Sequence, residues 1–283
     1  MGCEMEFLQL RYFCDAAHSE NFTVTAKKFG VPPSAVSQSI TRLEKELGTS
    51  FFTRKANSIK LNAVGREFLL RISSVLVLMD DAVDYVTNNS KKRTLNICID
   101  ARRHKMLKII EKFKKNHPDT DVNVMHGSVL ENNDYDIIIA DYDLPLSDYE
   151  KRLILSEELA IALHKSNPLF EQKNLTVDML KNEPFITMNE KRPMHQVVMN
   201  VCADFGFTPH ITFQSDEPSY VGRLVALNLG VAIVPKAPSA ETYSKDVIFV
   251  PIKNYTRDIY AYILKSKLVL PYVENFLNLL KEI

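Results

Sequence analysis

Four short polar side chains recur at helical spacing near the N-terminus of the chain: Ser34, Ser37, Gln38 and Thr41. Positions three and four residues apart lie on one face of a helix, so these side chains would share one edge. A glutamine can form a bidentate hydrogen-bonded pair with adenine in the major groove of DNA, and a serine can reach a base edge or a phosphate. The pattern therefore predicts a helix that recognises duplex DNA. The alternative is an amphipathic helix whose serines are only solvated.

The same stretch is strongly basic in a chain whose net charge is zero. From Thr23 to Arg66 the chain carries eight Lys or Arg and only two acidic residues. A compact positive segment in a neutral chain indicates an anionic partner for that segment, nucleic acid being the commonest. We expect contacts to the DNA backbone from the helix N-cap Thr23 and from four basic residues: Lys28, Arg42, Arg54 and Lys55.

Residues 1–62 are predicted to form three short helices and a strand pair, the arrangement of a winged helix-turn-helix. Gly30 and Gly48 follow the second and third helices and suit left-handed C-caps. The two prolines at 32 and 33 fix a turn and start the third helix. The expected helices are 5–17, 23–29 and 33–47, and the expected hairpin is 51–61.

Residues 63–89 are predicted to form one long helix capped by Asn62. Apolar residues recur along it at alternating steps of four and three, which is typical of a coiled-coil seam. Such a helix needs a partner for its apolar face, and a homodimer would supply one; the alternative is that the helix packs on its own domain. The dimerisation residues predicted from this seam are Phe68, Ile72, Val75, Met79 and Val86.

From residue 94 onward, short apolar runs typical of strands alternate with helical patterns. This alternation predicts an α/β architecture with mainly parallel sheets, in which ligands bind at the carboxyl ends of the strands. The polar stretch 88–93 marks a linker, so residues 90–283 would form a separate C-terminal domain.

The N-terminal part resembles the LysR-type transcription regulators. The resemblance is carried by LQLRYF at 8–13, by NFTVTAKKFGVPPSAVSQSITRLEKELGTSFFTR at 21–54 and by IKLNAVG at 59–65. It continues in the C-terminal part through Phe113 with Pro118 and through the segment 224–235. Two departures are Pro33, where the family usually has a glutamine that touches DNA, and Asn228, where it often has a glycine.

The resemblance implies a periplasmic-binding-protein-like effector domain made of two α/β subdomains, with a small-molecule effector held between them. Subdomain I would comprise about 94–164 and 266–283, and subdomain II about 165–265. It also implies association as a homodimer or homotetramer. The basic junction at 101–105 would favour an anionic effector at a helix N-terminus; the alternative is that its side chains point into solvent. The effector-binding residues expected from the resemblance are Arg102, Arg103, Ser128, Thr187 and Ser219.

Catalysis and metal binding find no support in the sequence. There is no P-loop, nucleophile elbow, zincin motif or dinucleotide fingerprint, and the seven histidines lack metal-ligand spacing. The four cysteines form no Cys-x-x-Cys pair, and no apolar run is long enough to cross a membrane. We therefore expect a cytoplasmic bacterial regulator without a cofactor. The rival hypotheses are an effector-independent DNA binder with a non-functional cleft and an α/β enzyme with a DNA-binding head.

Overall fold

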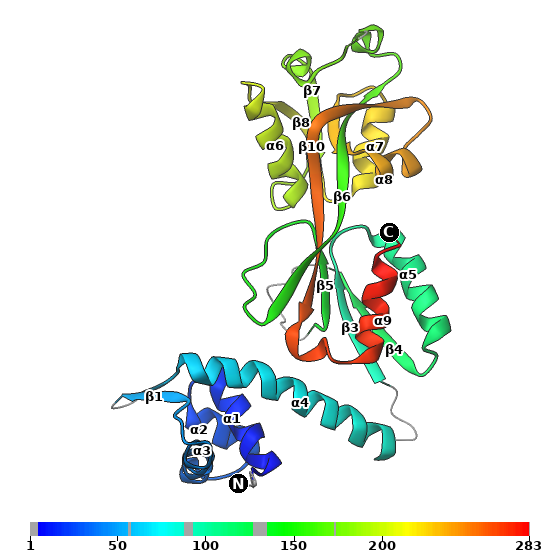
Figure 1. Ribbon diagram of the computed structural model, residues 1–283. Coiled ribbons are helices and arrows are strands. Elements are labelled where there is room, and N and C mark those ends of the chain that lie inside the picture. The colour runs from blue at the N-terminus through cyan, green and yellow to red at the C-terminus, as the bar shows by residue number, and fades with distance from the viewer. Residues whose placement is uncertain (1–4, 56–57, 88–92, 127–134, 173, 283) are drawn as a thin grey trace.

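The computed structural model describes residues 5–55, 58–87, 93–126, 135–172 and 174–282, with the side chains of Lys55 and Tyr85 left out. Figure 1 shows a helical N-terminal unit, a long helix beside it, and a taller C-terminal part that narrows at a waist. The N-terminal elements are α1 (Phe7–Ser19), α2 (Phe22–Phe29), α3 (Pro33–Leu47), β1 (Phe52–Lys55), β2 (Ser58–Leu61) and α4 (Ala63–Thr87). The predicted winged helix-turn-helix and the long helix after it are therefore confirmed.

Aromatic side chains hold the N-terminal unit together. Phe13 of α1 is fully buried, and its ring centroid lies 4.9 Å from that of Phe51 and 5.1 Å from that of Phe68. Phe51 and Phe68 stack with their planes only 3° apart and their centroids 4.6 Å apart. This packing joins α1, the start of the hairpin and the first half of α4 into one core.

Much of α4 packs on its own chain, so three residues of the predicted dimer seam are already partly or wholly buried within one chain. Ile72 is only 8% exposed, and both Phe68 and Met79 are partly buried against the same core. The reason is that apolar side chains of α1 pack along α4. The periodicity of α4 alone does not reveal this contact. Val75 and Val86 of the predicted seam stay on the surface, 47% and 78% exposed.

The C-terminal part is built on a six-stranded sheet with the order β4-β3-β5-β10-β6-β9 and a two-stranded sheet β7-β8. Its strands are β3 (Arg93–Ile99), β4 (Thr120–Met125), β5 (Ile137–Ala140), β6 (Tyr149–His164), β7 (Pro184–Met188), β8 (His210–Ser215), β9 (Ala232–Pro235) and β10 (Val247–Leu264). Its helices are α5 (Arg103–Asn116), α6 (Pro193–Asp204), α7 (Pro218–Ala226), α8 (Lys236–Thr242) and α9 (Pro271–Leu280), with 3₁₀ turns at Pro168–Glu171, Val177–Leu180 and Lys265–Lys267.

The sheet is mixed rather than mainly parallel. β3 pairs in parallel with β4 and β5, and β7 pairs in parallel with β8. β6 and β10, however, run antiparallel to each other along most of their length and pass through the waist of the molecule. The prediction of mainly parallel sheets was therefore wrong. These two long strands each cross from one half of the C-terminal part to the other, and they are not part of a β-helix-β repeat.

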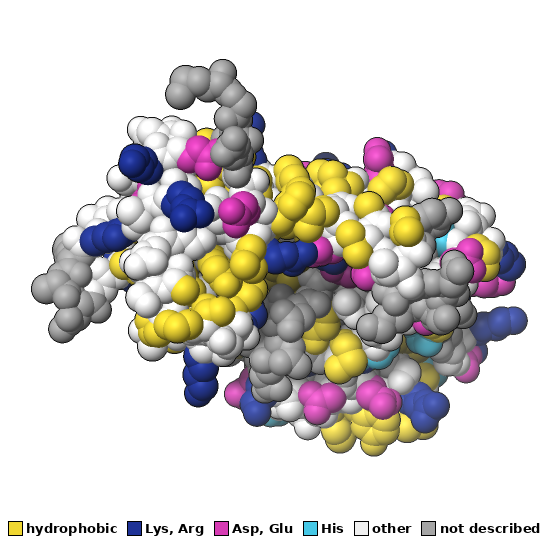
Figure 2. Space-filling model, turned by 90° about the horizontal axis from the view of Figure 1, so that it is seen from below, with side chains coloured by type: hydrophobic (Ala, Val, Ile, Leu, Met, Phe, Trp, Pro, Cys, Tyr) yellow, Lys and Arg dark blue, Asp and Glu magenta, His cyan; other side chains and the backbone are white. Residues whose placement is uncertain are grey.

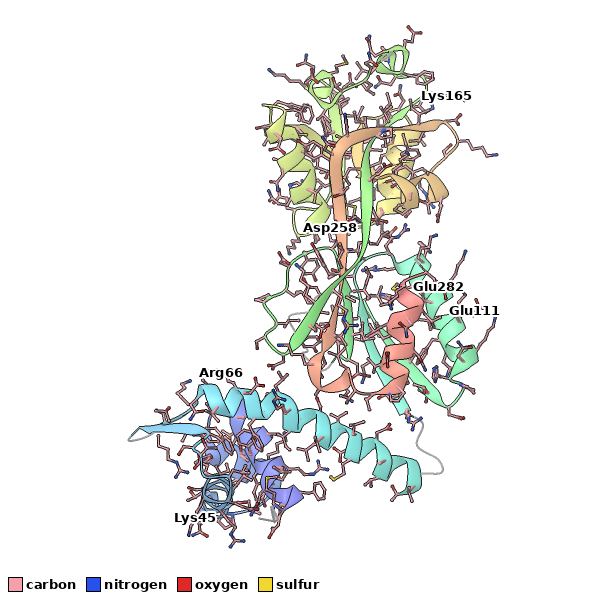
Figure 3. The ribbon with its side chains drawn as sticks, in the orientation of Figure 1. Lys45, Arg66, Glu111, Lys165, Asp258 and Glu282 are labelled. Carbon is pink, nitrogen blue, oxygen red and sulfur yellow. The ribbon has the colours of Figure 1, made fainter. Side chains whose placement is uncertain are left out.

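Two separate cores lie on either side of the waist, and we call the parts around them subdomain I and subdomain II. The first core combines residues of β3, β5, α5 and α9 with Ile259 and Ile263 of β10. The second combines β7, α6, α7 and β9 with Leu159 and Leu163 of β6. The long strands therefore contribute to both cores, and the cores divide the chain inside β6 and β10 rather than at residues 164 and 265. Figure 3 shows Asp258 of β10 at this waist.

Candidate nucleic-acid interface and ligand cleft

Both ends of α2 are fixed by local hydrogen bonds. Asn21 caps α2, because its side-chain oxygen accepts the backbone N–H groups of Thr23 at 2.9 Å and Val24 at 3.3 Å. The expectation that Thr23 is the N-cap was therefore wrong; Thr23 lies exposed in the first turn. Gly30 then ends α2 in the left-handed region, with φ 68°, as predicted for a C-cap.

The third helix has the two faces that the sequence predicts. Val36, Ile40 and Leu43 are completely buried. The polar edge lies opposite, and its side chains are exposed apart from the half-buried Ser37: Ser34, Ser37, Gln38, Thr41 and Arg42. No side chain caps the N-terminus of α3; Pro33 has no N–H and the N–H of Ala35 donates to the Pro32 carbonyl at 3.0 Å, which leaves the N–H of Ser34 for an anion such as a phosphate. Figure 3 places Lys45 of α3 at the outer edge of the N-terminal unit.

An unpredicted residue, Glu44, joins the wing to α3. One of its carboxylate oxygens accepts the backbone N–H groups of Phe51 at 2.8 Å and Phe52 at 3.3 Å. The other oxygen accepts a hydrogen bond from Arg54 Nη2 at 3.0 Å, and the same nitrogen lies 3.0 Å from the Thr41 hydroxyl. Arg54, predicted to contact phosphate, is thus also an intramolecular clamp between β1 and α3.

The other basic residues predicted to contact DNA differ in their exposure and in how closely a carboxylate pairs with them. Lys28 forms an ion pair with Asp15 of α1, although its side chain is 69% exposed. Arg42 is 73% exposed, and its nearest carboxylate is that of Glu6 at 4.0 Å. Lys55 ends β1, but its side chain lies outside the described part. Exposed cations with weak partners remain available to phosphates.

A cavity of about 430 Å³ separates subdomain I from subdomain II. Its walls come from the β3–α5 junction, the end of β7, the starts of α6 and α7, and the β9–α8 segment. This volume is in the range of ordinary small-molecule sites. The side chains predicted to bind an effector meet here: Arg102, Arg103, Thr187 and Ser219 all line the cavity. Ser128 lies outside the described residues.

A carboxylate distant in the sequence compensates the charge of Arg102 in the basic junction. Arg102 Nε lies 2.9 Å from Glu157 Oε1, and the two side chains are only 7% and 2% exposed. Arg257, the cross-strand partner of Glu157, donates to the same carboxylate through Nε at 3.0 Å. Arg257 Nη1 also donates to Asp141 Oδ2 at 3.1 Å. The charge of Arg102, part of the basic junction from which we predicted an anionic effector, is therefore compensated by acidic partners that lie outside the segment 101–105.

Asp100 connects the two subdomains across the cleft. Its Oδ1 accepts hydrogen bonds from Arg103 Nη2 and Arg192 Nη1, each at 3.3 Å. Arg103 belongs to subdomain I, whereas Arg192 precedes α6 of subdomain II. Asp141 nearby has a raised pKa because burial disfavours its charged form, an effect that the positive charge of Arg257 only partly offsets.

Two family models match the chain and together cover almost all of it. Residues 7–66 match the bacterial regulatory helix-turn-helix of the lysR family, and residues 88–283 match the LysR substrate binding domain. The chain belongs to the LysR family. It is a DNA-binding transcription regulator of LysR type with an effector-binding domain.

Similar LysR regulators occur among characterised proteins and solved structures. The transcriptional dual regulator GltC of Bacillus subtilis is 26% identical over 260 residues, covering 88% of this chain and 87% of GltC. BudR of Raoultella terrigena is 27% identical over 247 residues, covering 82% of this chain and 85% of BudR. Full-length BenM has the same fold, with a TM-score of 0.60 at 22% identity over 98% of this chain and 96% of BenM. CbnR in complex with its target DNA gives 0.57 at 20% identity over 98% and 99% of the two chains.

The matched proteins are transcriptional regulators, so membership of the LysR family excludes the enzyme hypothesis. Among the described residues, no helix is both long enough and apolar enough to cross a membrane. Asn228 has φ 57°, so the position where LysR regulators often have glycine does require the left-handed conformation here.

Sequence reasoning missed several residues of the cleft of this LysR regulator. Glu157, Asp141 and Arg257 lie on β6, after β5 and on β10, and no local motif marks them. The only available signal was their charge inside apolar strand sequence, since charged residues are rarely buried unless they are paired. Arg192 precedes a proline that starts α6, a position the sequence does indicate as a helix N-terminus.

Proposed function

We propose that this LysR regulator reads DNA through the polar edge of α3, with Gln38 and Ser37 directed at base edges. The observation that carries this assignment is the contrast between a completely buried face and an exposed polar edge on one helix. Thr41 and Arg54 would contribute differently, because Arg54 donates both to the Thr41 hydroxyl and to Glu44 and so holds the edge in place.

Phosphate contacts would surround this reading edge and fix its position on the duplex. Thr23 with the first turn of α2, Ser34 at the start of α3, and the cations of Lys28, Arg42 and Lys55 are the proposed contributors. Such contacts supply affinity without sequence preference and weaken as salt rises. CbnR, which has the same fold, has been solved with its target DNA, which supports a duplex as the partner.

We infer that two copies associate through the second half of α4. Its exposed apolar side chains follow one side of the helix at helical spacing: Val75, Leu78, Val83 and Val86. Figure 2 shows the underside of the molecule, where hydrophobic side chains gather in patches among the charged ones. Ile72 is left out of this surface because it is used inside the chain. A dimer would present two α3 helices to one DNA site, and a tetramer would present four.

The cavity between the subdomains is the proposed effector site. Its volume of about 430 Å³ favours a functional cleft over the rival of a filled, effector-independent one. A ligand bound to both subdomains would favour one relative placement of them, and α4 would pass this change to the DNA-binding units through its contact with the turn Lys265–Lys267. A regulator of chromosomal genes acts where the DNA is, so we place the protein in the bacterial cytoplasm.

Genome-wide mapping of the DNA bound by the full-length chain tests this function. We expect enrichment of a small set of promoter fragments, and we expect the purified chain to bind those duplexes more tightly than unrelated duplexes of the same length. A chain with Gln38→Ala and Ser37→Ala that folds normally should lose this preference. Enrichment indistinguishable from that of an untagged control would contradict the proposal.

A further inference from the structure

The charged residues deepest in the cleft balance one another. Arg102 and Arg257 share the carboxylate of Glu157, and Arg257 also binds Asp141. Two guanidinium groups thus face two carboxylates, all of them at most 13% exposed. This group has no net charge, and a buried ion network that is already paired offers a ligand little electrostatic attraction.

A second group, nearer the open part of the cleft, has a positive charge left over. The single carboxylate of Asp100 serves both Arg103 and Arg192. These two guanidinium groups are 44% and 26% exposed, so a ligand can reach them. The first N–H groups of α5 start at Arg103 with no side chain capping them, which adds to the positive potential at this place.

A negative charge is left over at the start of α7, on the wall of the same cavity. Glu217 lines the cavity as the exposed N-cap residue of α7; its Oε2 accepts a hydrogen bond from the Ser219 hydroxyl at 3.5 Å, but no cation in the described part of the chain forms an ion pair with it. The remaining pair of the lining, Lys105 and Glu241, lies 3.6 Å apart and cancels. With His104 counted as neutral, the cavity as a whole is neutral but carries one free positive and one free negative position.

The rest of the wall is largely apolar. Met188, Met194, Val221 and Tyr243 line it together with Thr187, whose buried hydroxyl has no hydrogen-bond partner among the described residues. Thr187 is 3% exposed, so a ligand group is the available partner for its hydroxyl. A buried polar group without a partner is unfavourable, which favours a ligand that supplies one.

We propose that the effector is a small zwitterion with an apolar side chain, of the α-amino acid type. Its carboxylate would bind at Arg103 and Arg192, and its ammonium group at Glu217. The inference rests on the proposed function of the cleft as an effector site. A simple anion would leave the Glu217 carboxylate without a charged partner and bring an uncompensated negative charge into a neutral cavity, at the cost of its hydration. An amine without a carboxylate would leave Arg103 and Arg192 without an anionic partner and bring an uncompensated positive charge into the cavity.

Matched probes test the proposal on the full-length chain. The thermal unfolding midpoint is measured with L-alanine, L-valine, L-leucine, L-methionine and L-phenylalanine, and with the 2-oxo acid and the amine of the same side chain. A ligand of the folded state raises the midpoint. We expect at least one amino acid to raise it while its 2-oxo acid and its amine at equal concentration do not. No shift with any of the five, or an equal shift with the 2-oxo acid, would overturn the proposal.

Two variants then locate the ammonium group. Glu217→Gln should weaken the affinity for the active amino acid about tenfold or more, because a charge-assisted hydrogen bond becomes a neutral one. Glu171→Gln, an exposed carboxylate of the same subdomain outside the cavity, should leave the affinity unchanged. Unchanged binding by Glu217→Gln would refute the assignment of Glu217.

Failure of this proposal and failure of the proposed function give different results. If a metabolite of another charge type stabilises the chain and changes its binding to mapped promoters, the cleft is an effector site and only the zwitterion proposal falls. If no member of a broad metabolite panel binds while promoter binding persists, the effector function itself falls, and the zwitterion proposal falls with it.

Discussion

Arg54 Nη2 lies 3.0 Å from Glu44 Oε2, so a charged pair joins the wing to the helix that carries the polar edge. Glu44 also accepts the backbone N–H groups at the start of β1, and its side chain is only 11% exposed. The orientation of the wing relative to α3 therefore depends on one carboxylate. We therefore expect Glu44 to act on DNA binding indirectly, through the position of the wing.

Replacing Glu44 should destabilise the N-terminal unit. Glu44→Ala leaves the N–H groups of Phe51 and Phe52 without their acceptor, and we expect a loss of about 1–3 kcal/mol in the free energy of unfolding. Chemical denaturation of the full-length chain measures this loss. Glu46→Ala, an exposed residue of the same helix, is the matched control and should change stability little. Equal losses for the two variants would argue against the clamp.

The buried network at the waist should be sensitive to removal of its central carboxylate. Glu157→Gln leaves the guanidinium groups of Arg102 and Arg257 without full compensation, and we expect a loss of about 3–5 kcal/mol. Its neighbour Glu158 is 68% exposed and pairs only with Lys236, so Glu158→Gln should cost less than about 1 kcal/mol. Denaturant unfolding of both variants gives the comparison; a Glu157→Gln protein as stable as Glu158→Gln would contradict it.

The cysteines of the described residues should be unreactive in the folded protein. Burial raises the pKa of Cys14 and of Cys98 to about 11 and that of Cys202 to about 12, from an ordinary value of 9.0. Because the folded pKa values are raised, the thiols stay protonated at pH 8 in the folded chain, whereas unfolding restores the ordinary thiolate fraction. The same shifts predict that stability is retained below pH 9 and decreases as the pH rises from about 9 toward 11 or 12.

A thiol-reactive dye checks this prediction at pH 8 on a chain carrying Cys3→Ser, which removes the cysteine outside the described residues. We expect slow labelling of the folded protein and fast labelling of all three thiols in denaturant. Labelling of the folded chain at the rate of the denatured one would show that burial does not protect them.

The exposed stripe on α4 should control self-association. Val75→Glu with Leu78→Glu places two charges on the proposed dimer surface, and like charges facing each other across a two-fold axis oppose association. Sedimentation analysis should show the wild-type chain as a dimer or tetramer and the double variant shifted toward monomer. Leu107→Glu, on α5 and 63% exposed, is a surface control that should leave this contact intact. A double variant that sediments like the wild type would exclude this stripe.

Local patterns predicted the elements of the N-terminal unit to within two residues. Gly30 and Gly48 end their helices in the left-handed region, and the spacing of Val36, Ile40 and Leu43 gives the buried face of α3. These features depend on neighbours within a few turns, so the sequence carries the information directly. The error at Thr23 is of the same local kind: Asn21 is equally suited to an N-cap and stands two residues earlier.

Features that depend on distant contacts could not be predicted in the same way. Ile72 has the spacing of a seam residue, and only the position of α1 decides that it is buried within the chain. Arg102 belongs to a basic segment, and only the pairing of β6 with β10 brings Glu157 and Arg257 to it. The family resemblance predicted where the cleft lies. The pairing of the charged residues inside the cleft could be seen only in the structure.

The most direct test of the central claim compares Gln38→Ala with Lys55→Ala on a mapped promoter duplex and on a series in which each base pair is changed in turn. We expect the wild-type chain to bind at low salt and to discriminate between bases. Gln38→Ala should lose about 1–3 kcal/mol of discrimination at one or two base pairs. Lys55→Ala should weaken binding to every duplex alike and lower the salt dependence by about one unit. Equal losses for both variants on every duplex, or a wild-type chain that ignores duplex DNA at low salt, would contradict the claim that α3 reads the groove.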